Sequence, residues 1–261
     1  MIDLRAETLT AVTAVREALD IARLGTGGVH AKIGRDVVTD ADIAVEDHLR
    51  RALTSAFEWP VIGEERGGTV PVGTPYWLVD PVCGTRNFAS AIPLYAVNAA
   101  MVENGRVSIA VVGDGSTGNV LVAEVGRGTW RLGRGAPVAL STTPVSLILD
   151  FGANPKAGPD RDGAALAVAE AIRRDRWTVR CLSTTLSLAY VAGGQIAGCV
   201  LFDVPDSIHT AAGSLLVAEA GGLVTNLEGE PWTIEACSLV CSADETFHRE
   251  VLDLLAACAS Q

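Results

Sequence analysis

The sequence predicts a layered protein of helices and sheets, with an α+β first half (residues 1–143) and an α/β second half (residues 144–261). In the first half, apolar runs are joined through Asn104-Gly105, the dipeptide typical of a two-residue β-hairpin, so neighbouring strands are expected to pair antiparallel. From residue 146 onwards, strand-like runs alternate with helical patterns, which is typical of α/β structure. With 261 residues, of which 49% are hydrophobic, the two halves are expected to form one compact unit.

Two amphipathic helices are expected to open the first half. Apolar residues recur at helical spacing between positions 9 and 22, and this run ends near Gly25. A second helix is expected to begin at Thr39, with Asp42 as the acidic member of a capping box. The strands expected in this half cover residues 61–62, 76–79, 97–103, 106–112, 121–125 and 129–132.

A polar, turn-rich passage at 137–144 is expected to separate the two halves. The strands expected beyond it cover residues 146–151, 177–182, 197–202, 223–224 and 239–240. The helices expected there cover residues 161–174, 184–192, 207–220 and 245–257. This order predicts a second sheet with helices packed on its faces.

Charge and composition argue against several classes of function. The formal net charge is −11 and only Lys32 and Lys156 are lysines, which disfavours a nucleic-acid surface or a polybasic membrane face. The N-terminus shows no secretory leader, and no apolar run approaches the ~18 residues of a spanning helix. The chain is therefore expected to be cytoplasmic and to act on a small molecule.

The six cysteines show no Cys-x-x-Cys spacing, so neither a disulfide framework nor a cysteine zinc cluster is predicted. Five of them are expected to be buried as small hydrophobic residues. Cys83 is set apart by its position in the candidate site.

The stretch 77–88 is that candidate site. Asp80 follows a buried apolar run, and Pro81 and Gly84 are expected to force a sharp exit that leaves Asp80 at the end of its strand. A carboxylate there, followed by free amides at Gly84 and Thr85, suits a cation beside a phosphate. The alternative is a capped turn between a strand and a helix, without function.

Residues 80–88, Asp-Pro-Val-Cys-Gly-Thr-Arg-Asn-Phe, resemble the signature Asp-Pro-Ile-Asp-Gly-Thr-x-Asn-Phe of the inositol monophosphatase family. Further stretches similar to family elements, in the same order, are 36–42, 62–65, 211–213 and 219–222. The resemblance covers most of the chain. It implies a layered αβαβα sandwich, a magnesium-dependent phosphatase ancestry and a homodimer.

The resemblance also implies roles for individual residues. One magnesium ion would be held by Glu64, Asp80 and the carbonyl of Val82. Glu65 or Thr85 would help to position the attacking water. From the residues alone, the pair at 64–65 is better explained as a solvated turn than as a cation ligand with a neighbour, and the resemblance together with the nearby Asp80 favours the ligand role for Glu64.

Substrate contacts are expected from the amides of Gly84 and Thr85, with Asp42 and Asp206 as further candidates. Asp42 has a structural explanation as the capping residue of its helix, while its family counterpart lies near the metals. The capping role and the site role are therefore weighed equally.

Two departures from the family pattern fall on metal-binding carboxylates. Cys83 stands where the first signature has its second Asp, and Ile208-His209 stands where the second signature has Trp-Asp. Since the family places both carboxylates on one ion, Cys83 and His209 are expected to be neighbours. The loss of both predicts weak magnesium binding, and zinc or a metal-free pocket are the alternatives.

The local context of each replacement predicts its protonation state. His209 is expected in the first turn of a helix from Ser207, where the amide dipoles favour a neutral imidazole. Cys83 is expected at the start of a helix-like turn, which would lower the pKa of its thiol. The alternatives are a histidine that fills the space left by an Asp, and a cysteine that acts as a small hydrophobic residue.

The leading functional hypothesis is a fold repurposed for acid/base chemistry of lyase, isomerase or cyclase type on a small polar or anionic metabolite. His209 would be the general base, Cys83 an orienting group or nucleophile, and Asp80 or Glu64 the acid or cation binder. One alternative is a magnesium-dependent phosphatase of inositol, sugar or nucleotide monophosphates. The other is a catalytically inactive binding protein that kept the fold.

Overall fold

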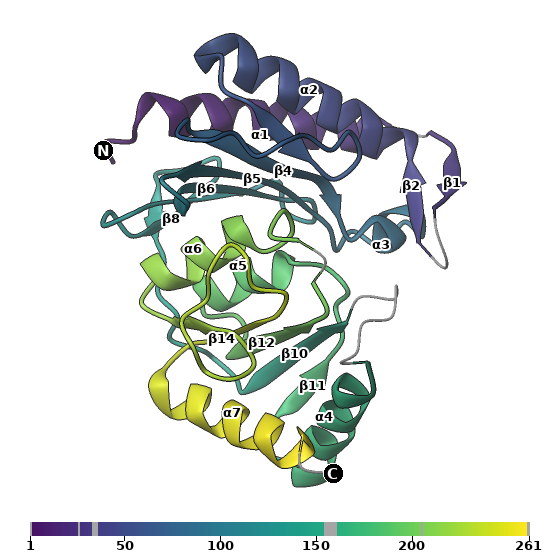
Figure 1. Ribbon diagram of the computed structural model, residues 1–261, viewed down its shortest axis with the longest axis vertical. Helices are drawn as coiled ribbons and strands as arrows, with labels where there is room; N and C mark the ends of the chain where they lie inside the picture. Colours follow the sequence, from purple (N-terminus) through teal and green to yellow (C-terminus); the bar gives the residue numbers. More distant parts are fainter. Residues whose placement is uncertain (1, 26, 33–35, 154–160, 205, 260–261) are drawn as a thin grey trace.

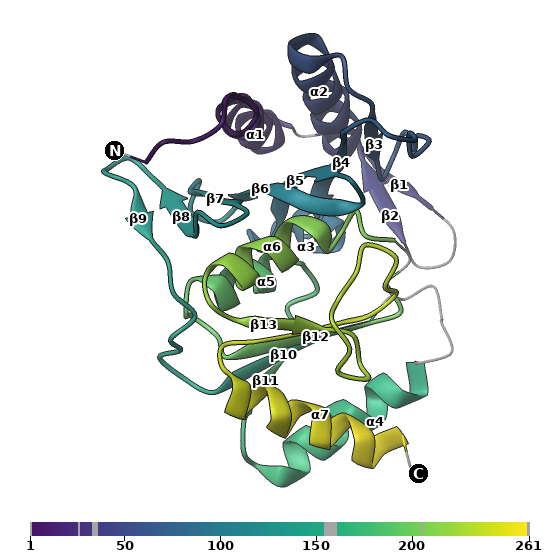
Figure 2. The ribbon, with the colours of Figure 1, turned by 60° about the vertical axis from the view of Figure 1, so that its left-hand side comes forward.

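The computed structural model describes residues 2–25, 27–32, 36–153, 161–204 and 206–259. Its helices are α1 (Ala6–Leu24), α2 (Asp40–Phe57), α3 (Thr85–Ala89), α4 (Arg161–Arg174), α5 (Leu186–Ala192), α6 (Ala211–Glu219) and α7 (Glu245–Ala259). Helices and sheets stack in alternating layers: α1 with α2, a first sheet, α5 with α6, a second sheet, and α4 with α7 (Figure 1). The turned view in Figure 2 shows the same sequence of layers. The expected αβαβα sandwich is therefore confirmed.

The first sheet is mainly antiparallel, as the hairpin signal predicted. In spatial order its strands are β3 (Val61–Gly63), β4 (Tyr76–Cys83), β5 (Ala96–Glu103), β6 (Arg106–Asp114), β7 (Val120–Glu124), β8 (Thr129–Leu132) and β9 (Val138–Ala139). Among the described strands of this sheet, β3 and β4 pair in parallel and the other neighbouring pairs are antiparallel. Asn104 and Gly105 connect β5 to β6 with φ angles of 52° and 72°, the left-handed conformation that this tight turn requires.

Three short strands were not predicted. β1 (Val29–Ala31) and β2 (Val37–Thr39) form a separate antiparallel pair, and β9 lies inside the passage expected to consist of turns. Each has two or three residues, too few for an alternating pattern to stand out from its surroundings.

The second sheet is mixed. Its strands, in spatial order, are β11 (Thr178–Arg180), β10 (Ile148–Ala153), β12 (Gly198–Phe202), β14 (Leu239–Ser242) and β13 (Leu223–Thr225). β10 pairs in parallel with both of its neighbours, and β14 pairs antiparallel with β12 and β13. The expected alternation of strands and helices is present, and the proposed division of the chain at 143/144 stays a prediction.

Three apolar clusters fill the spaces between the layers. One packs α1 and α2 onto the first sheet, and another packs α4 and α7 onto the second sheet. The central cluster joins α5 and α6 to the inner faces of both sheets, with Leu186 and Leu216 fully buried. Because this cluster contacts both sheets, it holds the two sheets and the helices α5 and α6 in fixed relative positions.

Asp80 does not end its strand. β4 continues to Cys83, with Asp80 opposite Asn98 and Cys83 opposite Ala96 on β5. Three steps on β4 thus correspond to two on β5, which is a β-bulge. Pro81 has no N–H to donate to the ladder, so the chain bulges there rather than leaving the sheet.

The helix expected from Ser207 begins later, at Ala211. Residues 207–210 form a turn that carries His209, and Asp206 Oδ1 accepts a hydrogen bond from the N–H of Ile208 at 3.0 Å. The assignment of His209 to the first turn of a helix is therefore wrong.

All six cysteines are free. Cys199, Cys241 and Cys258 are buried as expected, whereas Cys181 and Cys237 are exposed, against the expectation for them. Within the described residues, no helix is both long enough and apolar enough to cross a membrane.

Candidate functional site

A cavity of about 630 Å³ lies where the two halves meet. Its first-half lining comes from Asp36, Glu64, Asp80, Val82, Cys83, Gly84, Thr85 and Arg86. Its second-half lining comes from Phe151, Gly152, Ala164, Ala165, Val168, Cys181, Ser183, Thr184, Thr185, Leu201, Phe202, Val204 and His209. One end of the cavity is therefore rich in acidic and other polar groups, and the wall formed by β10, α4 and β12 is mostly apolar.

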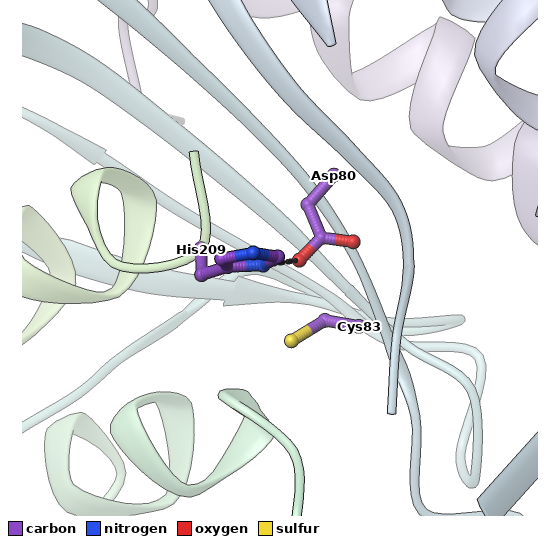
Figure 3. Close-up of side chains that lie close together, drawn as sticks. All are labelled: Asp80, Cys83 and His209. Atoms are coloured by element: carbon purple, nitrogen blue, oxygen red, sulfur yellow. Dashed lines mark hydrogen bonds and ion pairs between the residues drawn. The ribbon is translucent and has the colours of Figure 1, made fainter. Parts of the chain in front are cut away.

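Asp80, Cys83 and His209 meet at the polar end of this cavity (Figure 3). The Nδ1–H of His209 donates to Oδ2 of Asp80 at 2.8 Å. One ligand atom from each of the three side chains lies within 4.8 Å of the other two. The structure thus brings together the two replaced positions, which the sequence predicted to be neighbours.

Cys83 is held by a residue that the sequence did not single out. The hydroxyl of Thr185 donates to Sγ of Cys83 at 2.8 Å, and the backbone N–H of Thr185 donates to the same atom at 3.3 Å. Asn98 in turn donates to the hydroxyl oxygen of Thr185 at 3.0 Å. This chain of donors fixes the direction of the thiol.

The second oxygen of Asp80 has a different environment. Asp80 is fully buried, and its Oδ1 has no hydrogen-bond partner among the described residues. Figure 3 shows this oxygen pointing away from His209. A buried oxygen without a partner is costly, and a cation bound beside Glu64 and the carbonyl of Val82 would satisfy it.

The pKa of the Glu64 carboxyl group is raised by its surroundings. Burial and the neighbouring Asp80 carboxylate raise its pKa to about 7, although Lys32 lies within 3.2 Å of its Oε1. In the metal-free protein, the pKa of Glu64 therefore lies near neutral pH.

Glu65 is not among the residues that line the cavity. Its side chain is 4% exposed and accepts a hydrogen bond from Lys32, and burial raises its pKa. Its backbone N–H donates to Glu46, a fully buried carboxylate on α2, at 2.7 Å. A Cβ at Gly63 would lie only 2.2 Å from Oε1 of Glu46, so the glycine lets this carboxylate approach the turn. Glu46 and Lys32 therefore position the pair at 64–65.

Asp42 combines the two roles that the sequence left open. Its Oδ2 accepts the backbone N–H of Thr39 at 2.9 Å, completing the capping box of α2. Its Oδ1 accepts a hydrogen bond from the hydroxyl of Thr85 at 3.1 Å, so the same carboxylate orients a hydroxyl in the cavity.

Gly84 has a φ of 102°, and a Cβ there would lie 2.9 Å from the carbonyl oxygen of Leu94, so this position requires glycine.

The predicted protonation states of the two replacements are wrong. Burial opposes a charge on His209, but Asp80 and Cys83 outweigh it and raise the pKa of the imidazole well above its usual value. Burial and the Asp80 carboxylate raise the pKa of the Cys83 thiol to about 11, against the effect of His209 and Thr185. Burial and the neighbouring Asp80, rather than local helix dipoles, dominate the pKa of Cys83, and the distant residues Asp80 and Cys83 dominate that of His209.

Three predicted site residues do not line the cavity: Asp42, Glu65 and Asp206. Asp206 is exposed and accepts the N–H of Ile208, as described above. The sequence did not predict three residues that hold the site in place: Lys32, Glu46 and Thr185. Lys32 is one of only two lysines in the chain, a signal that could have identified it, but no local pattern distinguishes the other two.

The chain is similar to known proteins over almost its whole length. The sequence pattern described as the Inositol monophosphatase family matches residues 3–260. An inositol-1-monophosphatase of Mycolicibacterium smegmatis, ImpA, is 31% identical over 264 residues, which cover 97% of this chain and 95% of that protein. An inositol-1-monophosphatase of Rhizobium meliloti is 34% identical over 86% of this chain and 85% of that protein. The crystal structure of the extragenic suppressor protein suhB from Bartonella henselae shares the fold, with a TM-score of 0.84 at 24% identity over 96% of this chain and 98% of that one.

The buried, protonated thiol of Cys83 leads to a first prediction. In metal-free native protein at pH 8, iodoacetamide should modify Cys83 at least about 100-fold more slowly than the exposed Cys237, because the thiolate is the reactive form. Mass spectrometry of tryptic peptides at successive times measures both rates. Unfolded protein serves as the control, in which the two rates should converge. Equal rates in the native protein would contradict the assignment.

A second prediction concerns Glu64. Its pKa is about 7 in the folded, metal-free protein and near 4.5 when unfolded, so the folded state binds the proton more tightly. Its contribution to stability is therefore largest at low pH and declines as pH rises from 4.5 through 7. Relative to Glu64→Gln, the wild-type free energy of unfolding should fall by about 1 to 3 kcal/mol over that range.

Urea unfolding with a chelator present, at several pH values, measures this difference. The exposed Glu228 offers the matched substitution Glu228→Gln, which should leave the pH dependence as in the wild type. A constant difference between wild type and Glu64→Gln would show that Glu64 is ionised throughout.

Proposed function

The chain belongs to the inositol monophosphatase family, and on that premise we propose that it hydrolyses a small phosphate monoester in the cavity around Asp80. The observation that carries the proposal is the buried Oδ1 of Asp80, which has no partner among the described residues and which a cation would satisfy. Glu64 supplies a further oxygen donor in the same cavity. This proposal replaces the leading hypothesis drawn from the sequence, because no relative described above favours a lyase, isomerase or cyclase.

The oxygen donors of the cavity fit one magnesium ion. Glu64, Asp80 through Oδ1, and the carbonyl of Val82 would hold it, since Mg²⁺ takes hard oxygen ligands and keeps several waters. When bound, such an ion polarises the phosphoryl group and lowers the pKa of a bound water. The second ion position of the family does not fit magnesium in this chain. Oδ2 of Asp80 is hydrogen-bonded to His209, and Cys83 offers sulfur in place of oxygen.

Several side chains of this protein are arranged to position the reactants. The hydroxyl of Thr85, held between Asp42 and the carbonyl of Val82, faces the cavity and is proposed to orient the attacking water. Gly84 and Thr85 are proposed to contact the phosphate. Lys32 offsets the charge of Glu64 and Glu65 and keeps the acidic turn in place.

The apolar wall of the cavity supports a proposal about the substrate. The side chains of Phe151, Val168, Leu201, Phe202 and Val204 line it, and the cavity volume exceeds the needs of a phosphate group alone. Hydroxyl groups placed against such a wall would lose their hydrogen bonds to water without replacement. We therefore propose an ester whose alcohol part presents an apolar face, rather than a polyol. The expectation of a polar or anionic substrate then applies only to the phosphate group, and not to the alcohol part.

A second candidate is the acid/base conversion expected from the sequence. The hydrogen bond of 2.8 Å between Asp80 and His209 favours it, because it is the arrangement of a catalytic dyad. The two candidates differ in their product, since only hydrolysis releases inorganic phosphate. The expected homodimer, cytoplasmic location and lack of nucleic-acid partners remain predictions.

Hydrolysis is tested by measuring phosphate released from phenyl phosphate with and without Mg²⁺. Release should require the ion, and Glu64→Gln should lower kcat by about 10² to 10³, because loss of a ligand weakens a charge stabilisation of several kcal/mol. Glu228→Gln, an exposed substitution of the same kind, should change kcat less than about twofold. Undiminished release in the presence of a chelator would overturn the role of the ion. A total lack of release would favour the dyad or a binding protein.

Substrate choice is tested by the ratio of kcat/KM for phenyl phosphate to that for inositol 1-phosphate. The ratio should be about 10 to 100, since burial of a ring contributes roughly 1.5–3 kcal/mol. Val168→Thr keeps the shape of a half-buried cavity residue but adds a hydroxyl, and should lower the ratio about threefold or more. Val72→Thr is the matched control, because Val72 is 98% exposed. A ratio below one would contradict the apolar assignment.

A further inference from the structure

We infer that Asp80, Cys83 and His209 form a binding site for a divalent transition-metal ion of the zinc class, next to the oxygen site around Glu64. The inference extends the proposed function, because the ion would lie in the same cavity. It rests on separate observations, and its test requires no turnover.

The first observation is the set of donor atoms. A carboxylate oxygen, a sulfur and an imidazole nitrogen lie within 4.8 Å of one another. Oxygen-only sites suit magnesium, whereas mixed sulfur and nitrogen donors suit zinc and its neighbours in the transition series. Three protein ligands with an open fourth position are the usual arrangement of a zinc ion that also contacts a substrate or water.

The second observation is that the atoms need to move little. Zn–S and Zn–N bonds of about 2.3 and 2.0–2.1 Å place tetrahedral ligand atoms about 3.3 to 3.6 Å apart. Nδ1 of His209 and Oδ2 of Asp80 lie 2.8 Å apart and would separate slightly around an ion. The Sγ atom lies within 4.8 Å of one nitrogen of His209 and one carboxylate oxygen of Asp80, close enough to approach by a small rotation of its side chain.

The third observation is that neighbouring groups hold the ligands in place. Thr185 donates two hydrogen bonds to Sγ of Cys83, and Asn98 anchors the hydroxyl of Thr185. Asp80 is fully buried, while the side chain of His209 is 22% exposed and borders the cavity. Hydrogen bonds of this kind orient metal ligands, and the exposed edge leaves an approach for an ion.

The two oxygens of Asp80 are available to the two proposed ion sites separately. Its Oδ1 has no hydrogen-bond partner among the described residues, and its Oδ2 accepts from His209, so the same carboxylate offers one oxygen to each position in the cavity that Glu64 also lines. On binding, the divalent ion replaces the proton of the thiol and the Nδ1 proton of the imidazole, and both protons leave to solvent. The ligands then present a thiolate, a neutral imidazole and a carboxylate.

Cobalt(II) is the probe for this site, because a thiolate bound to Co²⁺ gives a charge-transfer band in the near ultraviolet. Titration of Co²⁺ into the metal-free full chain should produce this band with one equivalent, and Zn²⁺ should displace it. Cys83→Ser should abolish the band, and His209→Asn should weaken Co²⁺ binding about 10-fold or more. The exposed Cys237 provides the control Cys237→Ser, which should leave both unchanged.

Two further measurements separate this site from its surroundings. Glu64→Gln should retain the Co²⁺ band but lose magnesium-dependent hydrolysis. The two measurements therefore test the metal site and the proposed hydrolysis separately. Thr185→Val removes the hydroxyl that donates to Sγ and should weaken Co²⁺ binding about 10-fold. X-ray absorption of the Co²⁺-loaded wild type should show one sulfur neighbour, whether or not the variants fold. Absence of sulfur, a band that survives Cys83→Ser, or a band lost in Glu64→Gln would overturn the inference.

Discussion

The hydrogen bond between Asp80 and His209 is the contact on which the rest of the site depends. It joins residues that are 129 positions apart, one at the bulge of β4 and the other in the turn before α6. A fully buried carboxylate requires polar partners, and the imidazole supplies one for Oδ2. The other oxygen, Oδ1, has no hydrogen-bond partner among the described residues. A single side chain thereby separates a hydrogen-bonded side of the cavity from an acidic side.

The central layer of helices makes this contact available. α5 and α6 pack against both sheets, and the residues that precede them, Thr185 and His209, lie against the end of β4. Because close-packed interiors resist displacement, the thiol and the imidazole are held in place by the core as well as by their own hydrogen bonds. The apolar wall of the cavity also belongs to the core, since Leu201 and Val204 contribute to the central cluster and Phe151 and Phe202 to the cluster between the second sheet and α4 with α7. Site geometry and core packing are therefore coupled.

The replacement of two carboxylates changes the electrostatics of the cavity unequally. On the side of Glu64, burial and the repulsion of the Asp80 carboxylate raise the pKa of Glu64 to about 7. On the other side, Asp80 and Cys83 outweigh burial and raise the pKa of the His209 imidazole well above its usual value, while burial and Asp80 raise the pKa of the Cys83 thiol to about 11. A hard cation is favoured where the repulsion persists, and a softer one where sulfur and nitrogen have replaced oxygen. The proposals for hydrolysis and for a second type of ion thus follow from one asymmetry.

Local sequence patterns determined much of the fold and the position of the site. The Asn104-Gly105 turn, the capping box of Thr39 and Asp42, and the helix at 161–174 needed only neighbours in the chain. The resemblance of 80–88 and of 211–222 to two family signatures was sufficient to predict that Cys83 and His209 are neighbours. The tertiary structure alone decided their protonation, the bulge at Asp80, and the partners of the site, Lys32 and Thr185. These features depend on groups far apart in the chain, whose burial and mutual distance no local pattern encodes.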